Sequence, residues 1–320
     1  MVLIHCLSPG SRCARTDRSA LRYRYALRHA LKDAKQVFHF AAQVAVRTSL
    51  IDPVHDFEVN SSGTLNLLEE MRSLFDPPPL VFTSTNKVYG NLPDIQFQQN
   101  HTRYQPIVGA GFPCPGISED RPIDFHSPYG CSKGAADQYV LDYARTFGMP
   151  TVVFRMSCIY GPHQFGTEDQ GWVAHFLIRA IKGQPVTLYG DGMQVRDILF
   201  VEDLVDAFLL AQENIRTLSG QAFNIGGGIE NTISLLEFIE LIREIHGKKP
   251  TVYFDNWRPG DQCYYVSDTR KFQAATGWTP QLSIPQGVRK LYQWLLSRRI
   301  IATPCDRWDF IKRCPQPELT

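Results

Sequence analysis

Three features that would point to particular classes of protein are missing from this sequence of 320 residues. Its eight cysteines form no C-x-x-C pair, so we expect reduced thiols in a cytoplasmic protein and neither a disulfide framework nor a zinc site. No stretch approaches the ~20 apolar residues of a membrane span, and residues 1–9 are too weakly patterned for a secretory signal. The 33 basic residues balance 32 acidic ones, which argues against nucleic acid or a membrane surface as the main partner. A small-molecule ligand fits this composition better.

Histidine is present but shows no metal-binding pattern. Of the nine histidines, His39 lies in an apolar run, and His126, His163 and His175 have no partner at a ligand spacing. We therefore expect packed or solvated histidines and no metal.

Short apolar runs alternate with helical patterns along the first half of the chain. The strand-like and helix-like segments are 37–40, 56–75, 80–84, 128–147 and 151–154. Such alternation predicts an α/β fold, a parallel sheet with helices on both faces. Residues 91–126 carry many Pro, Gly, Gln and Asn residues without a sustained period, and we expect a long loop there.

The most informative local feature is a tyrosine and a lysine one helical turn apart. Tyr129 and Lys133 share one face of the helix predicted for 128–147, since side chains at i and i+4 are neighbours. Pro128 suits the first helical position, with Ser127 as the cap. A positive charge beside a phenol, whose pKa is ordinarily ~10, could make it a usable base at neutral pH. The same pair also occurs by chance on amphipathic helices, so other residues must decide its meaning.

Three short segments fall where the predicted parallel strands end. Ligands bind at the carboxyl edges of such strands. Small residues there would let a cofactor approach the backbone, and a threonine could exchange a hydrogen bond with a reacting hydroxyl. The segments are Ala41-Ala42-Gln43, Ser84-Thr85-Asn86 and Arg155-Met156-Ser157.

Together with the Tyr129 and Lys133 pair, these segments resemble the extended short-chain dehydrogenase/reductase family from about Val37 to Leu296. The resemblance implies a tightly held NAD. By position, Thr85 would bind the substrate hydroxyl, Tyr129 would exchange its proton, and Lys133 would lower the pKa of Tyr129 while binding the nicotinamide ribose. The resemblance further implies that the cofactor-binding residues are Ala41, Ala42, Gln43, Asn60, Ser84, Tyr129, Lys133, Arg155, Met156 and Ser157.

The resemblance also suggests how the chain is divided. We expect residues 1–165 to form an NAD-binding, Rossmann-like domain with a doubly wound parallel sheet. Residues 166–297 change to shorter elements and are expected to form a smaller, interleaved substrate-binding domain that returns segments to the sheet. Residues 298–320 depart from the family and form an atypical tail. The apolar stripe of 128–147 would serve either a homo-oligomer or internal packing.

Longer motifs narrow the activity that the family implies. Residues 84–90, 124–139 and 169–173 resemble those of members that invert C2 of a CDP-sugar by transient oxidation. The sugar 4,6-dehydratases of the family place an acid pair directly after the catalytic threonine. Here those positions hold Asn86 and Lys87, which cannot replace the carboxyl groups that donate and accept protons when water is eliminated. A solvated loop is the other interpretation of these two residues.

The diphosphate of a nucleotide-sugar requires cationic donors. The resemblance implies that the substrate-binding residues are Thr85, Asn86, Gln170, Trp172, Val173, Arg196 and Arg258. Plainer alternatives stay open. Surface arginines usually pair with carboxylates, Trp172 at a helix start could pack into the core, and Asn60 could be an ordinary helix cap.

The glycine-rich turn of the family cannot be found. Members open with a strand, a G-x-x-G-x-x-G turn and a helix that holds the pyrophosphate of NAD, but Gly10 alone precedes Gly63 here. We therefore expect an N-terminally incomplete Rossmann-like sheet, which a wrongly placed start or a frame-shifted copy would explain. Two hypotheses remain: an NAD-dependent nucleotide-sugar epimerase with a damaged cofactor clamp, or a catalytically silent, epimerase-like protein that binds a nucleotide-sugar or a partner.

Overall fold

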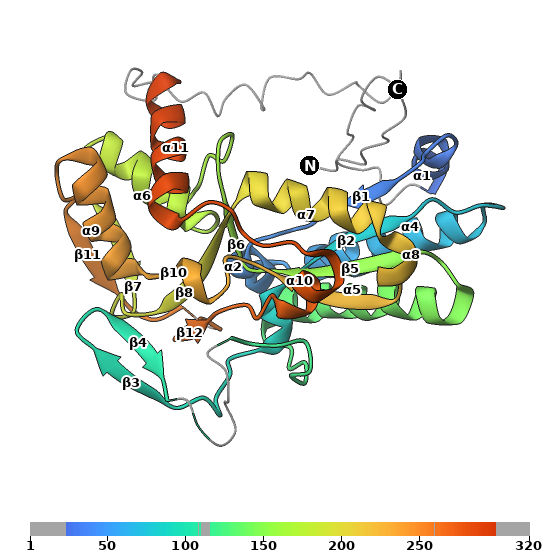
Figure 1. Ribbon diagram of the computed structural model, residues 1–320, viewed down its shortest axis with the longest axis horizontal. Coiled ribbons are helices and arrows are strands. Elements are labelled where there is room, and N and C mark those ends of the chain that lie inside the picture. The colour runs from blue at the N-terminus through green and yellow to red at the C-terminus, as the bar shows by residue number, and fades with distance from the viewer. Residues whose placement is uncertain (1–23, 108, 110–115, 259, 299–320) are drawn as a thin grey trace, which may run out of the picture.

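The computed structural model describes residues 24–107, 109, 116–258 and 260–298 (Figure 1). The expectations for residues 1–23 and for the tail beyond 298 lie outside these residues. The α-helices are α1 (Arg24–Leu31), α2 (Val46–Ile51), α3 (Pro53–Phe57), α4 (Gly63–Arg72), α5 (Ser127–Phe147), α6 (Trp172–Ile181), α7 (Val201–Glu213), α8 (Ile215–Leu218), α9 (Leu235–His246), α10 (Arg270–Thr276) and α11 (Ile284–Ser297). Shorter helical turns are the π-helix η2 (Glu58–Ser62) and the 3₁₀ turns η3 (Asn86–Tyr89) and η4 (Ile229–Asn231).

The strands fall into one main sheet and several smaller ones. Their bounds are β1 (Val37–His39), β2 (Leu80–Thr85), β3 (Phe97–Asn100), β4 (Arg103–Pro106), β5 (Thr151–Met156), β6 (Cys158–Tyr160), β7 (Val186–Tyr189), β8 (Val195–Phe200), β9 (Gln221–Ile225), β10 (Thr232–Ser234), β11 (Val252–Asp255) and β12 (Tyr264–Tyr265). The main sheet has the order β1-β2-β5-β9, and every pairing in it is parallel.

Helices cover both faces of the main sheet because its strands alternate their apolar side chains between two cores. Phe82 and Val153 pack with Leu67 of α4 and Val140 of α5, and α1 adds Leu27. On the other face, α7, α8 and α10 pack against neighbouring strand residues. Figure 1 shows α5 and α7 on opposite sides of the sheet. The predicted doubly wound parallel sheet is confirmed.

A second group of elements packs beside the main sheet. Strand β8 pairs with β6, β10 and β12, while β7 pairs with β11. Helices α6, α9 and α11 share a core built around Phe176, Phe238 and Leu291. Between these elements the chain returns to the main sheet through α7 and β9, which pairs with β5. The division into domains at residues 165 and 297 stays a prediction.

Two local predictions need correction. The helix expected over 56–75 is present but runs from residue 53 to residue 72, and it contains the π-turn Glu58–Ser62 between α3 and α4. Such π-turns are frequent at functional sites. The loop expected over 91–126 contains the β3–β4 hairpin, because tertiary contacts hold it: the rings of Phe97 and Tyr264 lie 6.0 Å apart, and Tyr104 N donates to Met193 O at 2.9 Å.

Helix α5 uses most of its apolar stripe for internal packing. Ala136, Val140 and Tyr143 are buried against the main sheet, whereas Tyr139 and Phe147 remain 43% and 46% exposed. The helix ends at Gly148, whose φ of 66° is the left-handed conformation that glycine adopts without strain. Self-association through the exposed residues stays a prediction.

Within the described part of the chain, no helix has the length and apolar character to cross a membrane.

Candidate active site

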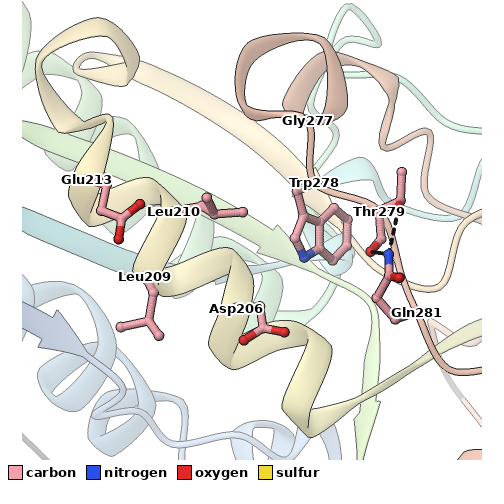
Figure 2. A pocket seen from close by; sticks show the side chains of 8 residues that line it. All are labelled: Asp206, Leu209, Leu210, Glu213, Gly277, Trp278, Thr279 and Gln281. Atoms are coloured by element: carbon pink, nitrogen blue, oxygen red, sulfur yellow. Dashed lines mark hydrogen bonds between the residues drawn. The ribbon is translucent and has the colours of Figure 1, made fainter.

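A cavity of about 810 Å³ opens at the carboxyl ends of β1, β2 and β5 and extends to the second group of elements. Its wall contains most of the side chains that the sequence nominates. These are Ala42, Ser84, Thr85, Asn86, Tyr129, Lys133, Met156, Ser157, Gln170, Trp172, Val173, Arg196 and Arg258. A smaller hollow of about 370 Å³ lies between α7 and the segment after α10, and none of the predicted residues lines it (Figure 2). The larger cavity is therefore the candidate active site.

Thr85, Tyr129 and Lys133 are brought together from β2 and the first turns of α5. Ser127 fixes the start of that helix, since its hydroxyl accepts the N–H of Gly130 at 3.2 Å. Thr85 and Tyr129 line the same wall of the cavity. Thr85 also contacts its neighbour, donating to Oδ1 of Asn86 at 3.3 Å. Tyr129 and Lys133 thus share one wall of the cavity with the hydroxyl of Thr85, which is predicted to bind the substrate.

The two titratable groups of this trio are shifted in opposite directions by the same cause. Burial raises the pKa of Tyr129 to about 12, and the hydrogen bond from Thr85 opposes this rise. Burial lowers the pKa of Lys133 to about 7, while the charges of Asp137 and Asp56 oppose the fall. The Lys133 ammonium donates to the carbonyl oxygen of Thr83 and lies 4.2 Å from the centroid of the Phe82 ring. A lowering of the tyrosine pKa by Lys133 stays a prediction, because in this arrangement the ammonium is bound to the backbone of β2.

Arg155 does not line the cavity, contrary to its assignment as a cofactor ligand. Its guanidinium forms two 2.9 Å hydrogen bonds to the carboxylate of Asp137, and a 3.1 Å hydrogen bond to the Tyr89 hydroxyl. The side chains of Arg155 and Asp137 are only 5% and 1% exposed. Because both charges are buried together, this pair fastens β5 to α5, and the charge of Arg155 is neutralised by Asp137 behind the cavity wall.

Ala41, Gln43 and Asn60 also lie behind the wall. Ala41 packs in the core. Asn60, in the π-turn, accepts the N–H of Gln43 at 2.9 Å and donates to its carbonyl oxygen at 3.1 Å. Gln43 in turn folds back onto both backbone groups of Ala45. Asn60 is therefore neither a plain helix cap nor a free ribose ligand, and it shapes the loop that carries Ala42 into the wall.

A cluster of cationic side chains lines the part of the cavity that the second group of elements forms. Arg196 donates to Asp261 at 2.6 Å and to Val195 O at 2.8 Å. The guanidinium carbon of Arg258 lies 3.7 Å from the centroid of the Tyr189 ring, and its Nη1 donates to Glu168 O at 2.9 Å. These positions place both predicted arginines where an anionic diphosphate could be held.

Lys87 also belongs to this cluster. From the sequence, Lys87 was notable only because it occupies a position where the dehydratases of the family have an acid. Its ammonium donates to the carbonyl oxygen of Gly260 at 3.0 Å and lies 3.9 Å from Asp261. Burial lowers the pKa of Lys87, and the Asp261 carboxylate opposes this. The position of Lys87 could have indicated this role. It follows Thr85 by two residues just after the end of β2, and Ser84, Thr85 and Asn86 were already assigned to the site.

Trp172 serves packing and cavity wall at once. Its ring meets Phe238 edge to face at 5.1 Å, and its indole N–H points to Cys158 Sγ at 3.5 Å. The preceding Gly171 has a φ of 75°, which lets the chain turn sharply into α6. Gln170 and Val173 lie on the same wall. The two interpretations of Trp172 are therefore compatible.

The cavity wall fits the nicotinamide end of NAD. Ser84 Oγ is buried in this wall and has no hydrogen-bond partner among the described residues, so a ligand with polar groups would satisfy it. Tyr129 and Lys133 line the same wall as further donors, whereas the Ser157 hydroxyl already donates to Asp197. The segment ahead of α1, in which the family's glycine-rich turn was sought, lies outside the described residues. No cluster of side chains suited to a metal ion is found in the described ranges.

Comparisons with known proteins identify the family of this chain. The pattern of the family described as "NAD dependent epimerase/dehydratase family" matches residues 4–226. The chain is 45% identical over 267 residues to the CDP-paratose 2-epimerase of Salmonella typhi, covering 81% of this chain and 77% of that protein. It is 31% identical over 275 residues to dTDP-glucose 4,6-dehydratase 1 of Escherichia coli, covering 82% and 72%.

Solved structures give the same result. The UDP-glucose 4-epimerase of Thermus thermophilus in complex with NAD matches with a TM-score of 0.73 and 33% identity, covering 86% of this chain and 83% of that one. The UDP-glucuronic acid 4-epimerase of Bacillus cereus, in complex with UDP-glucuronic acid and NAD, matches with a TM-score of 0.72 and 26% identity, covering 85% and 78%. The chain therefore belongs to the NAD dependent epimerase/dehydratase family, whose cofactor is NAD.

Proposed function

We propose that this protein converts CDP-paratose to CDP-tyvelose by inverting C2 of the sugar through a transient ketone. The observation that carries the proposal is the pairing of Thr85, Tyr129 and Lys133 in one cavity with Asn86 and Lys87 directly after the threonine. The 45% identity to a CDP-paratose 2-epimerase supports this choice within a family that acts on nucleotide sugars.

The proposed chemistry assigns one task to each residue of the trio. Thr85 holds the C2 hydroxyl, and Tyr129 takes its proton as C2 is oxidised. When bound, NAD supplies the acceptor for the C2 hydride and returns the hydride afterwards. Since burial raises the pKa of Tyr129 to about 12, its phenolate needs a compensating positive charge, and Lys133 one helical turn away can supply it. Tyr129 returns its proton when the ketone is reduced from its other face.

Inversion requires the ketone to present both faces to the same wall. The cations Lys87, Arg196 and Arg258 would hold the diphosphate, while the sugar turns about its link to that anchor. Thr85 on β2 and Lys133 on α5 would stay fixed. Dehydration of the sugar is disfavoured, because the amide of Asn86 and the ammonium of Lys87 offer no carboxyl pair to move the necessary protons.

The test is incubation of the purified protein with CDP-paratose, followed by chromatographic separation of the two CDP-sugars. We expect CDP-tyvelose to accumulate to an equilibrium that is also reached from CDP-tyvelose. Denatured protein should release NAD into the supernatant. A well-folded protein that binds CDP but releases no NAD and converts neither sugar would instead support the catalytically silent binding protein.

Arg258→Met is expected to weaken binding without changing the chemical step. A charged hydrogen bond to phosphate contributes about 1.5–3 kcal/mol, so KM should rise roughly tenfold or more while kcat stays nearly constant. Arg243→Met on the exposed face of α9 is the matched control and should leave both constants unchanged. Steady-state kinetics decide the matter: a fall in kcat at constant KM would exclude a binding role for Arg258.

A further inference from the structure

A buried acid lies directly behind the catalytic turn of α5. Asp56 of α3 is completely buried, and its carboxylate accepts hydrogen bonds from two neutral groups. These are the hydroxyl of Ser132 and Nδ2 of Asn60, the latter at 3.3 Å. Burial raises the pKa of Asp56, and the two hydrogen bonds oppose this rise. A carboxyl group costs free energy to bury, so its position calls for a reason.

Ser132 connects this acid to the catalytic pair. It lies between Tyr129 and Lys133 in sequence, and its Oγ is 3.2 Å from the carbonyl oxygen of Tyr129 and 3.0 Å from Asn60 Nδ2. Its own carbonyl oxygen accepts the hydroxyl of Ser61 at 2.8 Å. The π-turn and α3 therefore hold the turn of α5 that presents both catalytic side chains.

The charge of Asp56 also reaches the catalytic pair. It raises the pKa of Lys133 and that of Tyr129, because a negative charge favours the ammonium and disfavours the phenolate. The other acid near Lys133, Asp137, is already paired with Arg155. Two histidines among the described residues also act on this region: His55 on α3 near Asp56, and His39 on β1 near Lys133. Burial lowers the pKa of His39 to about 3, so its ring is neutral at neutral pH.

We propose that Asp56 is a positioning residue of the active site, which orients the Tyr129–Lys133 turn through its hydrogen bond with Ser132 and places a negative charge behind that turn. Only the kinetic consequence of this inference rests on the proposed function. The effect of the Asp56 charge on Lys133 can be measured in the purified protein without any turnover. Asp56 touches neither substrate nor cofactor, so its effect must pass through these two neighbours.

The test compares Asp56→Asn, Ser132→Ala and the control Asp52→Asn. Asp52 caps α3 from an exposed position, where it accepts the N–H of His55 at 3.0 Å. The pKa of Lys133 is measured by competitive labelling of amines with acetic anhydride over a range of pH, read by mass spectrometry of the peptide that carries Lys133. We expect Asp56→Asn to lower that pKa by about one unit, as the loss of a nearby opposite charge does. Ser132→Ala and Asp52→Asn should leave it unchanged.

The kinetics of the variants then separate the positioning of Tyr129 and Lys133 from the effect of the Asp56 charge. In Asp56→Asn the basic limb of the pH profile of kcat/KM should move to lower pH by the same amount as the pKa of Lys133. The affinity for CDP should stay unchanged. Ser132→Ala should lower kcat without moving that limb, because the contact is lost and the charge stays. Thermal unfolding checks that each variant is folded. An unmoved Lys133 pKa in folded Asp56→Asn overturns the inference, whereas wild-type protein that converts no CDP-sugar overturns only the proposed function.

Discussion

Tyr129→Phe should reduce the inversion of C2 by about 10²–10⁴-fold, the usual contribution of a positioned proton donor and acceptor. The phenol is the group in this wall that can both take a proton from the C2 hydroxyl and give it back. A phenylalanine ring fills the same buried space but offers no exchangeable proton. Interconversion of CDP-paratose and CDP-tyvelose by the variant is measured at saturating substrate, so that the loss registers in kcat.

Tyr139→Phe is the matched control for this substitution. It removes the same atom from the same helix, but Tyr139 is 43% exposed and does not line the cavity. The kcat of Tyr139→Phe should equal that of the wild type. Both variants should unfold within about 1 kcal/mol of the wild type, since each loses at most one hydrogen bond. If Tyr129→Phe turned over CDP-paratose at the normal rate, the assignment of the base would be wrong.

Arg155→Met should cost about 3–5 kcal/mol in the free energy of unfolding, the range observed when one member of a buried ion pair is removed. The substitution would leave the carboxylate of Asp137 buried at 1% exposure without its bidentate partner. Urea unfolding monitored by circular dichroism gives the change, with the midpoint moving and the slope staying constant.

Two further variants show whether the loss comes from the stranded charge. Arg145→Met removes an exposed arginine of α5, 4.0 Å from Asp142, and should change stability by no more than about 0.5 kcal/mol. The double variant Asp137→Leu/Arg155→Met removes both charges and should recover most of the lost stability. A single variant as stable as the wild type would show that the pair does not secure β5 to α5, and would reopen a ligand role for Arg155.

The grouping of Thr85, Tyr129 and Lys133 in one cavity wall was predictable because its signals are local. The four-residue spacing of Tyr129 and Lys133 places both side chains on one helix face whatever surrounds the helix. The apolar runs before Thr85 and Ser157 mark strand ends, and the carboxyl ends of parallel strands meet at one edge of a sheet. These regularities depend on backbone geometry, which the chain carries within a few residues. The same holds for the parallel sheet itself.

Partners distant along the chain decided what local patterns could not. Arg155 ends a strand just as Met156 and Ser157 do, yet its charge is taken by Asp137, 18 positions away. Asp56 meets Ser132 across 76 positions, and Lys87 reaches Gly260 across 173. Sequence alone thus determined the fold class and the placement of Tyr129 and Lys133 on one helix face in the cavity wall. Only the tertiary structure decided which charged side chains face the cavity and which neutralise one another behind it, because a buried charge takes its partner from whatever element the fold packs against it.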